Sequence, residues 1–172
     1  MNTTSIILGN ICSLLAMITD SIGSTRRTAR GVLAMQSLSQ VFFGAGAIVL
    51  KGYSAAVQNG LSIVRNLFAV SGKKCSWPEW LLVALGVVLG LGFNNLGLVG
   101  LLPVVANFTY SIAVFRFKEN EYALKAVFLT NVVMFIVFNA FIYNIVGVVA
   151  NAVVLVMTAV ALLREHKSRR AA

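Results

Sequence analysis

The composition of this chain of 172 residues is not that of a soluble domain: hydrophobic residues make up 59% of it and charged residues 11%, whereas soluble domains hold about 45–50% apolar residues. The block LLVALGVVLGLGF (81–93) has no polar face, so a helix over it needs lipid around it. The net charge of +9 does not indicate nucleic acid, because the cations form short clusters between apolar blocks rather than one basic face. These features predict a membrane protein.

Seven apolar blocks in chain order are the predicted membrane spans, since about 20 residues of helix cross a hydrocarbon core of roughly 30 Å. The spans cover residues 5–23, 30–50, 52–72, 79–94, 97–116, 122–142 and 144–164. Gly52 and the pairs Asn94-Asn95 and Tyr143-Asn144 predict tight turns between spans. The first 25 residues contain no Lys or Arg, so the first block is expected to be a retained span rather than a secretory signal.

The basic residues predict an orientation for these spans. Of the 14 cations, 12 fall after spans one, three and five or in the tail, counting Lys125 just inside span six. Cytoplasmic loops are rich in Lys and Arg, so we expect the N-terminus outside and the C-terminus in the cytoplasm. The tail REHKSRR (164–170) is expected to contact anionic lipid headgroups, with a partner-binding motif as the alternative.

A shift of 92 residues superposes the first three spans on the last three and leaves span four unmatched. The predicted units are a three-helix repeat (1–72), a cytoplasmic loop with a linker helix (73–96), a second three-helix repeat (97–164) and a basic tail (165–172). Asn59 then falls on Asn151, and Asn66 on Thr158. A displacement of four spans keeps the direction of each helix. The predicted fold class is therefore an all-α membrane protein with seven transmembrane helices in a 3+1+3 parallel-repeat arrangement.

This plan resembles that of the SWEET sugar transporters and the PnuC-type vitamin transporters. The stretches LGNICSLLAMITDSIGSTRRTARGVLAMQSLSQ (8–40) and GYSAAVQNGLSIVRNLF (52–68) more closely resemble the YgjV-like family of bacterial inner-membrane proteins, a distant relative of both. In SWEETs an asparagine on the last helix of each unit hydrogen-bonds the sugar, and the resemblance implies this role for Asn59 and Asn151. The chain departs from the SWEET pattern because spans one, two and six lack proline, and only Pro103 lies in a span.

Span three carries a polar face. At about 100° per residue, Gln58, Asn59, Ser62, Arg65 and Asn66 share a sector about 120° wide. Lipid cannot satisfy such groups, and an intramembrane charge costs at least ~2.5 kcal/mol, so the sector predicts a polar path. Carboxamides and hydroxyls suit an uncharged polyhydroxylated or amide solute, and hydrogen bonding between helices is the alternative. The candidate substrate-binding residues are Asn59, Asn151, Asn66, Thr158, Gln58 and Ser62. Polar residues on other spans that could join them include Asn10, Ser13, Asp20, Gln36, Gln40, Asn107, Tyr110, Thr130 and Asn131.

Arg65 breaks the repeat, because the residue that matches it in the second half is Met157. Three roles are open for it: a buried ion pair with Asp20, extension of the guanidinium toward the inner interface, or attraction of an anion in an asymmetric site.

No catalytic constellation is evident. The single histidine, His166, lies in the charged tail, and no cysteine, histidine or carboxylate cluster has metal-ligand spacing, so we expect no enzymatic activity, metal or cofactor. The sequence predicts a transporter or facilitator for an uncharged polar solute, such as a sugar or a vitamin- or nucleoside-like compound, that works by alternating access of two three-helix units. A non-transporting scaffold or accessory subunit is the alternative. Lipids and the solute are the expected partners, nucleic acid is not, and a homo-oligomer is left open.

Overall fold

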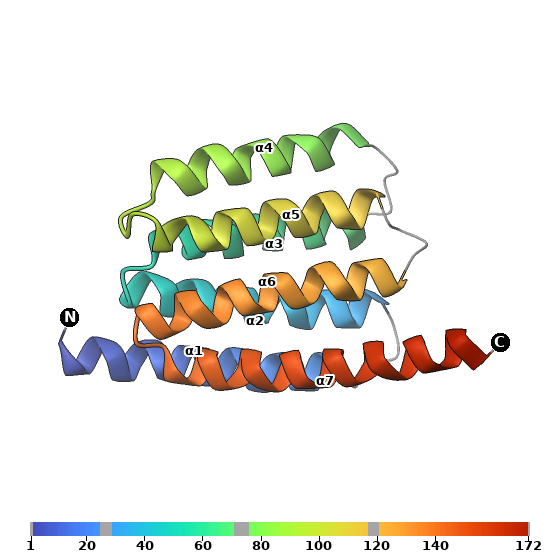
Figure 1. Ribbon diagram of the computed structural model, residues 1–172. Coiled ribbons are helices and arrows are strands. Elements are labelled where there is room, and N and C mark those ends of the chain that lie inside the picture. The colour runs from blue at the N-terminus through green and yellow to red at the C-terminus, as the bar shows by residue number, and fades with distance from the viewer. Residues whose placement is uncertain (1, 25–28, 71–75, 117–120, 172) are drawn as a thin grey trace.

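The computed structural model describes residues 2–24, 29–70, 76–116 and 121–171, and this described part is helical throughout, without strands (Figure 1). The elements are α1 (Thr3–Ser24), α2 (Ala29–Val49), α3 (Tyr53–Val70), α4 (Ser76–Gly92), the 3-10 turn η1 (Val99–Leu101), α5 (Leu102–Arg116), α6 (Glu121–Phe141) and α7 (Ile145–Ala171). The all-helical class and the seven helices predicted from the apolar blocks are confirmed.

Two helix bounds differ from the expected spans by more than three residues. α5 begins at Leu102 rather than at residue 97, because a turn built on Asn94 occupies the preceding residues. Asn94 Nδ2 donates to the carbonyl of Gly97 (2.8 Å), its Oδ1 accepts from the backbone N–H of Leu96 (3.1 Å), and Gly97 has a positive φ of 57°. α7 continues to Ala171, since residues 165–171 contain neither glycine nor proline to end it.

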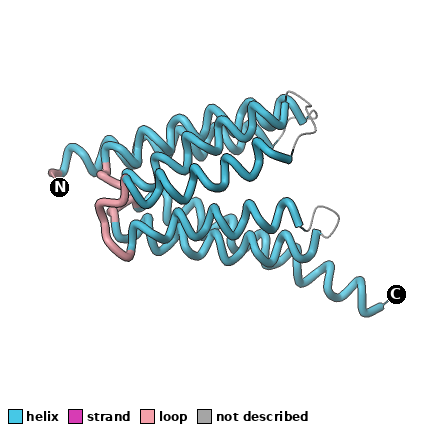
Figure 2. Tube along the Cα trace, turned by 90° about the horizontal axis from the view of Figure 1, so that it is seen from above, coloured by secondary structure: helices cyan, strands magenta, loops and turns pink. Residues whose placement is uncertain are grey.

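The helices form two layers that face each other. In one layer α2 packs between α1 and α3, and in the other α6 packs between α5 and α7. α4 covers one edge, where it contacts both α3 and α5, and α1 contacts α7 at the opposite edge (Figures 1 and 2). The connections 50–52, 93–101 and 142–144 gather at the end of the bundle that holds the N-terminus, which we name the turn end. The C-terminus lies at the other end.

The distribution of polarity is the reverse of that in a soluble protein. Large apolar side chains face outward, for example Leu67 (61% exposed), Val88 (65%) and Val156 (62%). The buried side chains include many polar ones: Ser13, Thr19, Ser39, Ser54, Gln58, Ser62, Asn66, Asn131, Asn139 and Asn144. Soluble proteins seldom expose such apolar area, so lipid is the natural surrounding of this surface.

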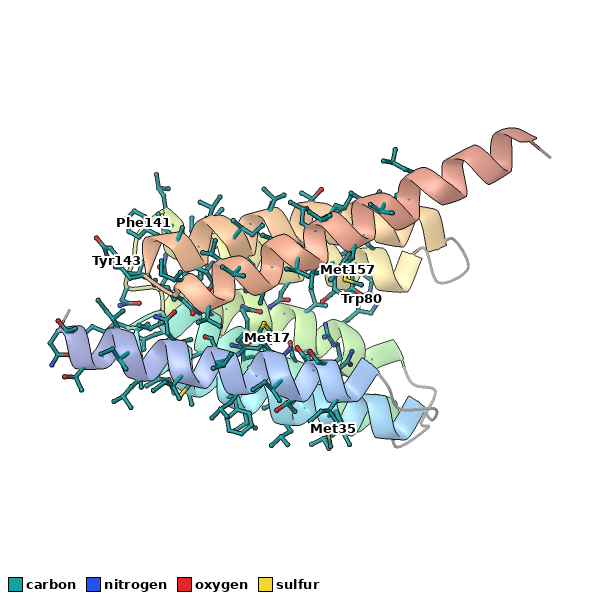
Figure 3. The ribbon with its side chains drawn as sticks, turned by 90° about the horizontal axis from the view of Figure 1, so that it is seen from below. Met17, Met35, Trp80, Phe141, Tyr143 and Met157 are labelled. Carbon is teal, nitrogen blue, oxygen red and sulfur yellow. The ribbon has the colours of Figure 1, made fainter. Side chains whose placement is uncertain are left out.

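Aromatic side chains mark both halves of the outer surface. Phe141 and Tyr143 are exposed at the turn end, and Trp80 is exposed on the half that holds the C-terminus (Figure 3). Tryptophan and tyrosine prefer the two interfaces of a bilayer, so this distribution agrees with an apolar surface that faces lipid between them.

One described stretch, Thr3–Ile22, is long and apolar enough to cross a membrane by length and composition alone. Shorter apolar stretches are Ala34–Val49, Trp80–Gly92, Val99–Ala113, Ala126–Phe141 and Ile145–Val160. α3 is in neither group, which we attribute to its polar face. Seven helices are thus established, whereas seven membrane crossings in a 3+1+3 arrangement stay a prediction.

An apolar core cluster lies at the turn end and joins the two layers. Its buried members come from α2, α3, α6 and the turns that follow α2 and α6: Ala47, Leu50, Ala55, Phe138 and Ile142. Gly52 makes room for this cluster, because a Cβ there would lie 2.9 Å from Cζ of Phe138. The turn end is therefore the firmly packed end of the described bundle.

The turns before α3 and α7 share one backbone geometry. Lys51 (φ 58°) and Tyr143 (φ 60°), which lie 92 residues apart, both adopt the left-handed conformation. Their hydrogen bonds match in pairs: Gly52 N to Ala47 O (2.7 Å) with Asn144 N to Asn139 O (2.9 Å), and Lys51 N to Ile48 O (3.0 Å) with Tyr143 N to Ala140 O (3.2 Å). This equivalence at the predicted offset supports the internal repeat.

Candidate functional site

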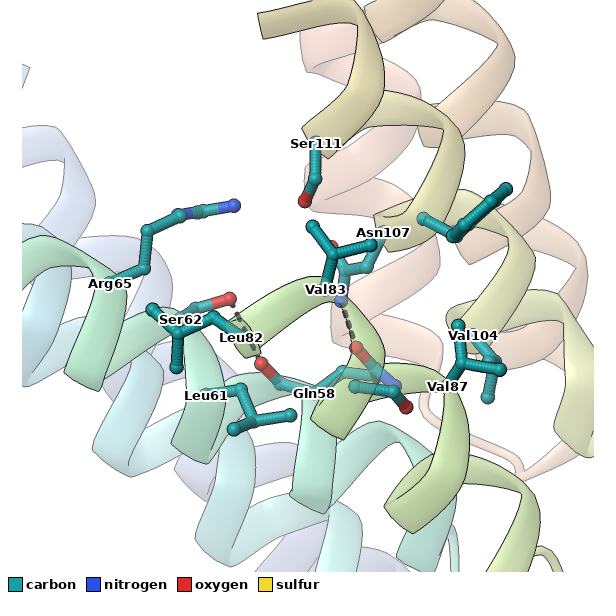
Figure 4. A pocket seen from close by; sticks show the side chains of 12 residues that line it. Gln58, Leu61, Ser62, Arg65, Leu82, Val83, Val87, Val104, Asn107 and Ser111 are labelled. Atoms are coloured by element: carbon teal, nitrogen blue, oxygen red, sulfur yellow. Dashed lines mark hydrogen bonds between the residues drawn. The ribbon is translucent and has the colours of Figure 1, made fainter. Parts of the chain in front are cut away.

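A polar cavity lies between α3, α4 and α5 (Figure 4). Its polar lining consists of Gln58, Ser62 and Arg65 from α3 and Asn107 and Ser111 from α5. The rest of the wall is Leu61, Leu82, Val83, Gly86, Val87, Val104 and Phe108. The volume is about 40 Å³, and a buried water needs about 10–15 Å³ on the same measure, so the cavity admits about three waters.

Gln58 is the hub of the polar network. Its side chain is 3% exposed, its Nε2 donates to the carbonyl of Gly86 on α4 (2.7 Å), and its Oε1 accepts from Nδ2 of Asn107 on α5 (3.2 Å). The Ser62 hydroxyl donates to the backbone carbonyl of Gln58 (2.9 Å; Figure 4). One carboxamide thus connects three helices, and it joins the first layer to the second.

Two glycines of α4 make room for this carboxamide. A Cβ at Gly90 would lie 2.6 Å from Nε2 of Gln58 and 2.6 Å from Cγ2 of Val104, and a Cβ at Gly86 would lie 3.4 Å from Oε1 of Gln58. The glycines of the run GVVLGLG (86–92) therefore allow α4 to lie close enough to α3 for the hydrogen bond from Gln58 to Gly86.

Arg65 is partly buried in the cavity wall, and its guanidinium extends into the space that Ser111 also borders (Figure 4). The described titratable group that interacts with it electrostatically is Tyr110 on α5. Within the described residues Arg65 forms no ion pair. Asp20 lies on α1 near Ser39 of α2, and α1 does not pack against α3, so the two charges of the predicted pair are not brought together.

The remaining predicted site residues do not line the cavity. Asn59 turns toward α2, where its Cβ lies 3.6 Å from the position of a Cβ at Gly44, and Asn66 is buried on the same helix. Asn151 donates to the carbonyl of Gly147 on its own helix (2.8 Å), and Thr158 is partly buried further along α7. α3 and α7 do not pack against each other. The assignment of a solute to Asn59 and Asn151 stays a prediction.

Sequence reasoning placed Asn107 among the polar residues that could join the path but did not single out Ser111. The spacing carried the signal, because residues four apart share a face of a helix and Ser111 follows Asn107 by four. Residues 81–92 of α4 contain no polar side chain that could indicate the part of this helix, which contributes a backbone carbonyl and two glycines.

A second polar contact between the layers closes the turn end. Asn10 on α1 accepts from the backbone N–H of Val146 through Oδ1 (2.9 Å) and donates to the carbonyl of Tyr143 through Nδ2 (3.0 Å). Nearby, Asn95 Nδ2 donates to the carbonyl of Lys51 (2.7 Å). These hydrogen bonds, together with the apolar cluster, hold the two layers together at the turn end.

Comparison with known proteins bears on the membrane assignment. No curated protein and no solved structure matches the chain. The similarity of the helix plan to SWEET and PnuC-type transporters stays a prediction. The family model Imp-YgjV, described as a bacterial inner membrane protein, matches residues 7–169, a range that includes every residue of the cavity wall. The match confirms the YgjV-like resemblance and agrees with the apolar outer surface of the bundle. The chain belongs to the Imp-YgjV family of bacterial inner membrane proteins.

Proposed function

We propose that the protein is a transporter of a small polar solute, and that the cavity between α3, α4 and α5 is its solute site. The observation that carries this proposal is the gathering of polar side chains around one cavity in a bundle whose outer surface is apolar. Polar and ionisable groups at membrane depth are costly and mark solute paths in many membrane proteins. Transporters built from repeated units also hold their sites between the units.

Alternating access would act on the hydrogen bond between Asn107 and Gln58, because these residues belong to different layers. At 3.2 Å this bond is the longest of those that Gln58 forms, and its donor and acceptor are the groups a polar solute would engage. The contacts of Asn10 and of the apolar cluster hold the turn end closed. The state described here would then exchange solute through the opposite end.

We further propose that the turn end faces outward and the C-terminus lies in the cytoplasm. The helix ends that flank segments 25–28, 71–75 and 117–120 all lie at the end of the bundle that holds the C-terminus (Figure 1). The sequence places most of its cations in or beside these segments and in the tail, where anionic lipid headgroups would hold them. Reporter fusions after Ala171 and before Thr3 test this: cytoplasmic activity at the C-terminus alone is expected, and the reverse result would contradict the orientation.

The transport proposal is tested by uptake into proteoliposomes that contain the purified protein. Radiolabelled sugars, nucleosides, vitamin-like amides and small carboxylates form the panel. At least one is expected to enter faster than into protein-free vesicles, and Gln58→Ala is expected to lower that rate at least tenfold. Gly60→Ala on the same helix is the control, because nothing lies within 4 Å of a Cβ there. The double variant Asn59→Ala with Asn151→Ala tests the site implied by the SWEET resemblance.

A membrane scaffold or accessory subunit is the second candidate, and one observation favours it. Buried amides form hydrogen bonds between helices, as in Asn131 Nδ2 to the carbonyl of Ala106 (2.8 Å) and Gln58 Nε2 to that of Gly86 (2.7 Å). Such bonds stabilise helix packing without any solute. If no solute of the panel moves and Gln58→Ala lowers only the stability of the protein, the scaffold function is correct.

A further inference from the structure

We infer that the cavity recognises an oxyanion, a carboxylate or phosphate group, through the guanidinium of Arg65. The inference rests on the proposed transport function and narrows its solute from polar to anionic. The sequence predicted an uncharged solute because its polar stripes consist of carboxamides and hydroxyls, whereas the lining of the cavity also includes the cationic side chain of Arg65.

The described residues of the cavity wall carry a net positive charge. Among these described residues Arg65 is the one with a charged side chain, and none of them is an aspartate or a glutamate. Arg65 has no ion-pair partner among the described residues. A guanidinium at membrane depth without a counter-ion is unfavourable, so an anion in the cavity would stabilise it.

The groups around Arg65 suit an oxyanion. A guanidinium presents planar N–H donors that match the two oxygens of a carboxylate or phosphate. The Ser111 hydroxyl borders the same space and can donate, and Asn107 uses Nδ2 toward Gln58, which leaves a second N–H on that nitrogen. The apolar walls supplied by Leu82 and Val83 keep the local dielectric low, which strengthens such contacts.

The volume of the cavity also favours a small oxyanion group. About 40 Å³ holds about three water-sized groups, which corresponds to the head of a carboxylate and falls short of a sugar ring. In the described state the site therefore fits the charged group of a solute, and the remainder of the solute would extend through the open side of the cavity.

Two sources share this chemistry, a free small anion and the phosphate of a lipid headgroup. The experiment separates them with the full-length protein in nanodiscs of zwitterionic phosphatidylcholine, and in parallel nanodiscs that contain anionic phosphatidylglycerol. The thermal unfolding midpoint is measured with sodium acetate, sodium phosphate or sodium chloride at equal ionic strength, and with glycerol as an uncharged polar probe. A ligand that binds only the folded state raises the midpoint as its concentration passes its Kd.

In phosphatidylcholine, acetate or phosphate is expected to raise the midpoint saturably above chloride and glycerol. Arg65→Gln is expected to raise the apparent Kd at least tenfold and Arg65→Lys less, because lysine keeps the charge but not the planar pair of donors. Lys51→Gln is the matched control, since it removes a cation from the exposed turn end and should leave the Kd unchanged. If Arg65→Gln does not fold, Ser111→Ala replaces it, with an expected rise of about threefold.

A lipid headgroup as the anion gives a different result that also supports the inference. The unfolding midpoint is then higher in phosphatidylglycerol than in phosphatidylcholine, and added acetate no longer changes it. Arg65→Gln abolishes the difference between the two lipids. Equal midpoints in all salts, or equal Kd values for Arg65→Gln and wild type, overturn it. Glu79 precedes Leu82 by one helical turn, so Glu79→Gln is included. If acetate binds only in that variant, a carboxylate of the chain already neutralises Arg65, and the inference is overturned.

The same nanodisc result separates this inference from the proposed function. Uptake of an uncharged solute without oxyanion binding that depends on Arg65 overturns the inference and leaves the transporter standing. Oxyanion binding that depends on Arg65, without flux of any anion in proteoliposomes, supports the inference and overturns transport.

Discussion

α3 and α7 occupy equivalent places in the two layers, yet only α3 lines the cavity. Both follow turns with the same hydrogen bonds and a left-handed residue, Lys51 before α3 and Tyr143 before α7. Their side chains then diverge. Arg65 lies in the cavity wall, whereas its match 92 residues on, Met157, is 68% exposed on the apolar surface.

The linker helix explains the difference. α4 packs on α3 and α5 and has no counterpart in the second half, so only α3 is covered on the side where Gln58 and Arg65 lie. The matches of Gln58 and Ser62 on α7 are Ala150 and Val154, which need no polar partner. Two helices that follow turns of the same geometry therefore differ in their part in the site, because α4 supplies the third wall beside α3.

The largest expected effect comes from exchanging Arg65 and Met157 between the two helices. Arginine costs roughly 2.5–3.5 kcal/mol at the centre of a membrane helix. Arg65 lies in the last third of α3, so Arg65→Met should improve insertion of segment 53–70 by about 2 kcal/mol. Met157→Arg should impair insertion of segment 145–162 by a similar amount. Glycosylation mapping of each segment in a microsomal host measures both, and unchanged insertion of Arg65→Met would show that the guanidinium reaches water in the isolated helix.

A substitution at Gly90 tests whether packing of α4 causes the difference between α3 and α7. A methyl group at this position would lie 2.6 Å from both Gln58 Nε2 and Val104 Cγ2, so Gly90→Ala should displace the carboxamide and destabilise the fold by about 2 kcal/mol. The unfolding midpoint in detergent mixed with SDS measures the change. Gly60→Ala on α3 is the control and should be neutral or slightly stabilising, because its Cβ meets nothing. Equal midpoints for the two variants would mean that α4 does not hold Gln58 as described.

The Gln58 side chain forms hydrogen bonds to other helices, whereas the Asn151 side chain bonds within its own helix. Gln58→Ala removes bonds to α4 and to α5, and at roughly 0.6 kcal/mol per bond between membrane helices it should lower stability by about 1 kcal/mol. Asn151→Ala removes one bond within its own helix and should cost about 0.5 kcal/mol or less. The same SDS titration compares them. A larger loss from Asn151→Ala would place a structural polar contact on α7 and not on α3.

The sequence predicted the helices well, because apolar blocks of about 20 residues and the turns at Gly52 and Asn144 leave little choice of element. It was less accurate before α5, where the Asn94 side chain caps a turn that hydropathy does not reveal. The offset of 92 residues, read from weak similarity, matches the two turns in their hydrogen bonds. Backbone features that depend on local sequence could therefore be predicted.

The sequence predicted only part of the cavity. The polar sector on α3 was predicted, but a helical wheel does not say which neighbour each edge of the sector meets. At about 100° per residue, Gln58, Ser62 and Arg65 lie at −60° to −120° from Asn59 and face α4 and α5. Asn59 itself turns toward α2. The division depends on long-range packing of glycines and carbonyls, which leave no polar pattern in the sequence.

Substitutions in the turns before α3 and α7 should change the stability of the protein by equal amounts, unlike substitutions in the two helices. These changes are the smallest of those predicted. Lys51 and Tyr143 hold a positive φ that costs an L-residue about 1 kcal/mol and glycine almost nothing. Both side chains are exposed, so Lys51→Gly and Tyr143→Gly should each stabilise the protein by about 0.5 kcal/mol, after the added freedom of the unfolded chain is counted. Lys51→Ala and Tyr143→Ala, which keep the strained backbone, should gain nothing. Opposite signs for the two glycine variants in the SDS titration would show that the turns differ energetically despite their matching hydrogen bonds, and the asymmetry between α3 and α7 would then begin in the turns rather than at α4.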